Sequence, residues 1–84
     1  MEGFKGTPGP WNVQFGDEIY AGDGVNNEQV AMANDCHDAC LIAAAPELLR
    51  SLQKLMKAME YGNAVSLRGA EADARAAILM ALGQ

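Results

Sequence analysis

The chain has 84 residues, half of them apolar, and a formal net charge of −5 at pH 7. This length and composition predict one folded domain over residues 1–84 with a modest core, and they exclude an intrinsically disordered chain. The sequence lacks both an apolar run near the ~20 residues of a membrane span and a secretory signal pattern, so we expect a cytoplasmic protein without a membrane partner. A chain this short gains stability by self-association, and a homo-oligomer therefore stays open.

The negative charge is concentrated in the first half of the chain. Residues 1–45 carry seven acids against one lysine, whereas residues 46–84 carry five basic residues against four acids. An acidic front argues against direct binding of nucleic acid and is compatible with a basic protein partner, although solubility alone also explains a charge of this size. We expect partner-binding residues where turns project from the fold, at Asp17, Glu18, Asp23 and Glu28.

The first strand is predicted just after a proline-rich segment. Two prolines and a glycine in residues 7–10 exclude a helix or a central strand there. Trp11, Val13 and Phe15 then alternate with polar residues, which is the period of a half-buried strand. We therefore expect Trp11 to be a core residue.

Turn residues divide the next segment into a small antiparallel meander. Gly16-Asp17 is predicted as a two-residue hairpin turn, followed by strands over residues 18–21 and 29–32. Two or three strands are not stable alone, so the apolar face of this sheet must lie on helices.

Two helices are predicted next, separated by a proline. Asn34 or Asp35 caps the first helix, which is apolar all round over residues 39–45 and is expected to be central and buried. Pro46 fits best as the first residue of the second helix, with one continuous kinked helix as the alternative. Gly62 is a plausible left-handed cap at its end.

A third helix is predicted over residues 70–82, with residues 64–69 either a loop or its start. Its small residues recur on one face and permit a close approach to another helix: Ala70, Ala74, Ala77 and Ala81. The resulting fold class is α+β, with a short N-terminal meander of two or three strands in residues 1–33 packed on about three C-terminal helices in residues 34–84.

The second helix carries the clearest periodicity of the chain. Its apolar residues recur at spacings of three and four and define one face that the rest of the chain must cover: Leu48, Leu49, Leu52, Leu55, Met56 and Met59.

Two short blocks resemble a family of small phage and prophage proteins of mostly unassigned function. They are Thr7-Pro8-Gly9-Pro10-Trp11 and Ala39 followed by Leu41-Ile42-Ala43-Ala44-Ala45-Pro46-Glu47-Leu48-Leu49. The alanine-rich helix near the C-terminus is similar too, whereas Cys40 departs from the basic or polar residue that family members often have. The resemblance implies phage origin and life inside a bacterial cytoplasm, and it implies no catalytic mechanism.

Cys36, His37 and Cys40 form the one cluster of metal-ligand residue types in the sequence. A closed zinc site needs four ligands, and this segment offers three besides carboxylates. Cysteines on a core helix are more often small buried hydrophobes, so we expect no metal. Neighbouring helix residues point in different directions, so Cys36 and His37 do not form a nucleophile pair, and we expect no enzyme and no cofactor.

Arg50, Lys54 and Lys57 form a basic stripe on the second helix. Doubled across an oligomer, this stripe would suit a ligand that carries phosphate, such as a nucleotide messenger. The simpler interpretation is a solvated face whose ion-pair partners are Glu47 and Glu60.

These features favour a non-enzymatic phage accessory protein that acts by binding. The most specific hypothesis is a counter-defence inhibitor of a host immune protein, of the CRISPR type or similar. The alternatives are an oligomer that sequesters a host nucleotide signal and an accessory protein of the virion or of replication.

Overall fold

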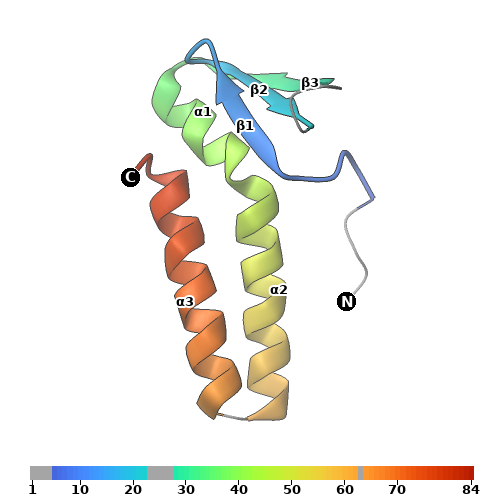
Figure 1. Cartoon of the computed structure of the whole chain (residues 1–84), viewed down its shortest axis with the longest axis vertical. Helices are drawn as coiled ribbons and strands as arrows, with labels where there is room; N and C mark the ends of the chain where they lie inside the picture. The colour runs from blue at the N-terminus through green and yellow to red at the C-terminus, as the bar shows by residue number, and fades with distance from the viewer. Residues whose placement is uncertain (1–4, 23–27, 63) are drawn as a thin grey trace.

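A three-stranded sheet precedes three helices along the chain, as predicted for the α+β class. The computed structural model describes residues 5–22, 28–62 and 64–84. The elements are β1 (Trp11–Gln14), β2 (Glu18–Ala21), β3 (Glu28–Met32), α1 (Cys36–Ala43), α2 (Ala45–Tyr61) and α3 (Ala64–Ala81). The sheet is an antiparallel meander of order β1-β2-β3 that lies with α1 at one end of the molecule, and α2 and α3 extend from this end as a helical hairpin (Figure 1).

The turn between β1 and β2 differs from the two-residue turn expected at Gly16-Asp17. Gln14 pairs with Glu18, so the connection has three residues and begins with Phe15. Phe15 and Gly16 both have positive φ, 57° and 86°. Hairpin loops of this length require left-handed residues, and Phe15 therefore leaves the strand instead of continuing its alternation. Its side chain is 80% exposed.

The core lies between the sheet and α1. Ile19, Ala39 and Ala43 form its centre, and Trp11 packs against them as predicted. Ile19 is the one large side chain that is fully buried among the described residues. The interior is therefore small and is made mainly of alanine methyl groups.

Helix α1 occupies the central place that was expected, but it is not buried on every side. It contacts β1, β2 and both other helices, and it buries Ala39 and Ala43. Leu41 is 55% exposed, and Ala45 just beyond α1 is exposed too. A helix that lies on one sheet at the end of a molecule keeps one face in solvent. In α1 this solvent-facing side includes the apolar residue Leu41.

Helices α1 and α2 are separate, as the better of the two alternatives predicted. Ala44 ends α1 and precedes α2, and Pro46 lies at the second position of α2, where its missing N–H group costs nothing. Asp35 caps α1 by accepting a hydrogen bond from the backbone N–H of Asp38 at 2.8 Å. Gly62 ends α2 with a φ of 63°.

Helix α3 starts earlier than residue 70, at Ala64, and packs antiparallel to α2 through its alanine face. Ala70 and Ala77 are buried in this contact. On one flank of the hairpin, the Ser51 hydroxyl donates a hydrogen bond to the Asp73 carbonyl at 3.3 Å, and Lys54 forms an ion pair with Asp73. None of the described helices has the length and apolar character that a bilayer crossing requires.

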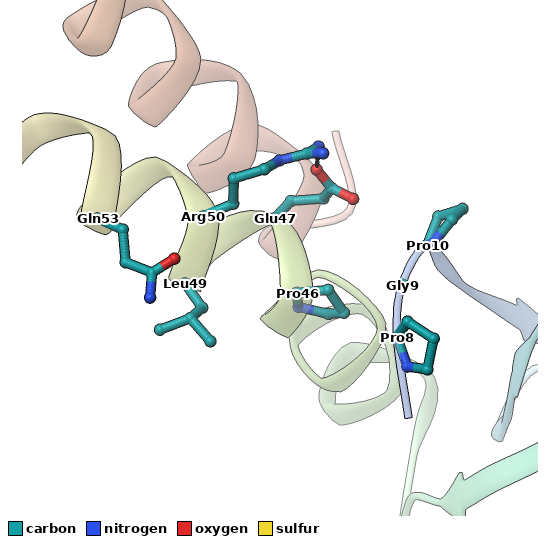
Figure 2. A pocket seen from close by; sticks show the side chains of 8 residues that line it. All are labelled: Pro8, Gly9, Pro10, Pro46, Glu47, Leu49, Arg50 and Gln53. Carbon is teal, nitrogen blue, oxygen red and sulfur yellow. Dashed lines mark hydrogen bonds and ion pairs between the residues drawn. The ribbon is translucent and has the colours of Figure 1, made fainter. Parts of the chain in front are cut away.

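The segment before β1 lies directly against the start of α2. A Cβ atom placed on Gly9 would lie 2.7 Å from the Cβ of Pro46, closer than real side chains approach. Figure 2 shows the backbone at Gly9 beside the ring of Pro46. Glycine is therefore needed here to bring the two segments together.

We predict that Phe15→Gly raises the free energy of unfolding by about 0.5–1 kcal/mol, because glycine adopts a positive φ without the steric cost that a Cβ imposes. Phe15→Ala is the matched control: it removes the ring but keeps the Cβ, so it should bring no such gain. Denaturant unfolding of the three chains measures the difference. A Phe15→Gly chain that is less stable than the parent would contradict the turn described above.

We further predict that Gly9→Ala lowers the free energy of unfolding by about 1–3 kcal/mol, since the new methyl group collides with a rigid proline ring. Gly69→Ala is its control. No atom outside the local helix lies within 4 Å of a Cβ at Gly69, and alanine is the better helix former by about 1 kcal/mol. Thermal melts should therefore shift in opposite directions, and equal shifts would show that the Gly9–Pro46 contact is not formed.

Candidate functional site

The tip of the β1–β2 hairpin combines an exposed aromatic ring with carboxylates. Phe15 projects from the turn, and Asp17 and Glu18 follow it within three residues. A bulky residue with positive φ costs of order 1 kcal/mol, and such strained residues cluster at functional sites. The turn therefore holds the large apolar side chain of Phe15 in solvent, although the positive φ at this position is unfavourable for a residue with a bulky side chain.

Hydrogen bonds fix this tip to the rest of the sheet. The backbone N–H of Ala33 donates to the carbonyl of Asp17 at 2.8 Å, which joins the turn to the end of β3. The Tyr20 hydroxyl donates to Oε1 of Glu18 at 2.8 Å. This hydrogen bond, together with desolvation and the charge of the same carboxylate, raises the pKa of Tyr20 above its ordinary value. Glu18 is thereby oriented on the outer face of the sheet.

The structure brings two of the predicted partner-binding acids together and leaves another apart. Asp17 and Glu18 are adjacent at the hairpin tip. Glu28 pairs with Ala21, at the opposite end of β2 from Glu18. Asp23 lies outside the described residues. The described acids therefore do not form one patch, and their contact with a partner stays a prediction.

Two exposed apolar residues extend the tip, and the sequence did not identify them as surface residues. Met32 pairs with Glu18 in the sheet and is 65% exposed. Leu41 of α1 lines a hollow of about 300 Å³ together with Met32. We call Phe15, Asp17, Glu18, Met32 and Leu41 the tip surface. For Phe15, the sequence does contain a signal of exposure, because an aromatic residue directly precedes the predicted Gly-Asp turn. The alternation of Trp11, Val13 and Phe15 led instead to its assignment to the strand.

The basic stripe on α2 has nearby carboxylates. Arg50 forms an ion pair with Glu47, and Lys54 forms one with Asp73 of α3. With Lys57, which is exposed, they follow one flank of the helix at spacings of four and three. A phosphate-bearing ligand at this stripe would have to compete with these carboxylates.

Cys36 and His37 are exposed and Cys40 is half-buried, and both cysteines are free. The expectation that both cysteines are buried was therefore wrong for Cys36, which lies in the first turn of α1 and faces solvent. Within residues 5–22, 28–62 and 64–84, no group of three or more His, Cys, Asp or Glu residues is placed to hold a metal ion.

The two blocks that carry the family resemblance meet in space. A hollow of about 510 Å³ lies between the N-terminal segment and the start of α2 (Figure 2). Pro8, Gly9 and Pro10 line it from one block, and Pro46 and Leu49 line it from the other. Because Gly9 packs directly on Pro46, these residues join the sheet to the helical hairpin.

Comparison with known proteins agrees with this resemblance. A family model described as Salmonella phage P22 protein Y8K6 matches residues 1–84. No curated protein and no solved structure matches the chain. Because the family model spans the whole chain, the protein belongs to the family of Salmonella phage P22 protein Y8K6.

Proposed function

We propose that this phage protein acts by binding and not by catalysis, and that it blocks a host defence protein through the tip surface. Exposed Phe15, held at positive φ beside Asp17 and Glu18, is the observation that supports the proposal most directly. Aromatic residues, phenylalanine among them, are enriched in protein–protein interfaces relative to the rest of the protein surface. A phage that must block a host protein needs only such a contact, which a chain of this size can provide.

The acids beside Phe15 suggest the chemistry of the target. Carboxylates complement basic surfaces, and such surfaces line the sites at which nucleic-acid-guided defence proteins hold their substrates. In this proposal Phe15 inserts into an apolar pocket of the target, and Asp17 and Glu18 lie against its basic residues. Met32 and Leu41 widen the apolar contact.

A plating assay tests the proposal. The chain is expressed in a panel of bacterial strains that each carry one defence system, and each strain is challenged with a phage which that system restricts. We expect the parent chain to restore plaque formation on at least one strain and Phe15→Ala to lose the effect.

Tyr61→Ala is the matched control for this assay. Tyr61 is also an exposed aromatic residue, 69% exposed, but it lies at the far end of α2 from the sheet. It should therefore keep full activity. Plaque formation unchanged by the parent chain on every strain would reject the proposal and leave a role in the virion or in replication.

Charge reversal separates the acids from the aromatic ring. Reversal of Asp17 and Glu18 to Lys should slow association with the identified target by about tenfold at low ionic strength, because long-range attraction is lost. The defect should shrink as salt rises toward ~1 M, where the screening length falls to ~3 Å. An association rate that does not change on reversal would leave the acids with a role in solubility alone.

The nucleotide-sequestering alternative has less support, because Arg50 and Lys54 already have carboxylate partners in the chain. It makes a distinct prediction, namely that a small phosphate-bearing molecule copurifies with the chain and is lost on Arg50→Glu. Mass spectrometry of the denatured protein would detect such a molecule.

A further inference from the structure

The hairpin of α2 and α3 leaves half of its most apolar face in solvent. On α2, Leu48 and Leu55 turn toward α3 and are half-buried. Leu49, Leu52, Met56 and Met59 remain 39%, 59%, 48% and 61% exposed. Because α3 meets α2 with alanines, it covers one side of the apolar face and leaves the other side open.

Side chains of α3 extend this open side. Ile78 and Leu82 are 52% and 61% exposed. At 3.6 residues per turn they lie on the flank of α3 opposite Asp73, and the Leu52–Met56 stripe lies on the flank of α2 opposite Lys54. The Lys54–Asp73 ion pair therefore marks one side of the hairpin, and the apolar residues of both helices share the other side. Glu71 and Arg75 of α3 lie on this second side too, where they form an exposed ion pair with each other. We call Leu49, Leu52, Met56, Met59, Ile78 and Leu82 the open face.

The open face is a contiguous apolar surface and not a set of scattered residues. Four of its six side chains, Leu52, Met59, Ile78 and Leu82, are more than half exposed, and they lie on two helices that pack side by side. Contiguous exposed apolar surface of this kind marks a site of protein–protein contact.

We propose that a second copy of this chain covers the open face. Leu49, Leu52, Met56 and Met59 are separated by three, four and three residues, and this spacing is the same in both directions along the helix. Two α2 helices can therefore pack antiparallel about a twofold axis near residue 54. Leu49 then lies opposite Met59 of the partner subunit, and Leu52 lies opposite Met56 of the partner subunit. The two hairpins form a four-helix bundle, and a twofold dimer is the commonest form of soluble oligomer.

The charges beside the stripe suit this antiparallel arrangement. Gln53 and Glu60 follow the stripe along its outer edge. The twofold axis places the two Gln53 side chains near each other and Glu60 near Pro46 of the partner subunit, so that no like charges meet along the two α2 helices. On α3, the carboxylate of Glu71 is paired with Arg75 of its own chain. Arg50 and Lys54 lie on the opposite side of each hairpin, so the dimer does not combine the basic stripes. The two tip surfaces stay free at opposite ends of the dimer.

Oxidation of methionine tests this inference on the unmodified chain. Met56 is 48% exposed and Met80 is 47% exposed, while Met59 and Met32 are 61% and 65% exposed. In an isolated chain each matched pair should react with peroxide at similar rates, since oxidation follows exposure. In the dimer, Met56 and Met59 should react several-fold more slowly than Met80 and Met32, and dilution should remove the difference. Equal rates at high protein concentration would overturn the proposal.

Sedimentation equilibrium supplies the second test. The parent should have twice the chain mass, Leu52→Lys/Met56→Lys should sediment as a monomer with an unchanged helical spectrum, and Leu79→Lys should remain a dimer. Leu79 is a fair control because it is 43% exposed and lies on the flank of α3 opposite the buried Ala77. A monomeric parent, or a dimer that persists in the double variant, would overturn the proposal, and this result does not depend on the plating assay. If the double variant unfolds, the oxidation rates of the parent chain decide.

Discussion

Most of the buried apolar residues in the described part of this chain are alanines. Ala39 and Ala43 lie beneath the sheet, and Ala70 and Ala77 lie against α2. Small side chains allow helix backbones to approach closely, but each contact removes little apolar area from water. Many large apolar side chains of the helices consequently lie outside these contacts and face solvent. The surface of the molecule is therefore unusually apolar for a chain with so small a core.

This distribution gives the molecule two ends with different properties. The sheet end carries the tip surface, where an exposed ring and two carboxylates are held by backbone hydrogen bonds. The other end is a helical hairpin in which one side carries the Lys54–Asp73 ion pair and the other side is mainly apolar. Helix α1 and the Gly9–Pro46 contact join the two ends. These joining residues maintain the fold. The tip surface lies away from them, whereas the open face begins beside them at Leu49.

Much of this architecture could be predicted from the sequence, because local chemistry determines it. Asp35 and Gly62 are cap residues of the expected types: Asp35 caps the start of α1, and Gly62 caps the end of α2. The alanine face of α3 and the core position of Trp11 also follow from simple periodicity. Phe15 was misplaced because alternation cannot tell whether a strand ends one residue earlier, and the register with Glu18 is a tertiary property.

The uncovered half of the α2 face could not be predicted for a related reason. Periodicity shows that Leu52 and Met56 are apolar neighbours of Leu55, but it does not show how much of this apolar face the side chains of a partner helix cover. Since alanines form the partner face of α3, they cover Leu55 and leave Leu52 and Met56 exposed. The tip surface was likewise predicted only in part. The sequence indicated its acidic residues in the turn, but it did not indicate the exposed apolar residues around them.

If a second copy completes the alanine-lined fold of one chain, the thermal unfolding midpoint of the parent chain must depend on protein concentration, since association stabilises only the folded state. Over a roughly hundredfold range of concentration we expect the midpoint to rise by several degrees, and we expect Leu52→Lys/Met56→Lys to remove the dependence. A parent midpoint that is the same at every concentration would contradict this association.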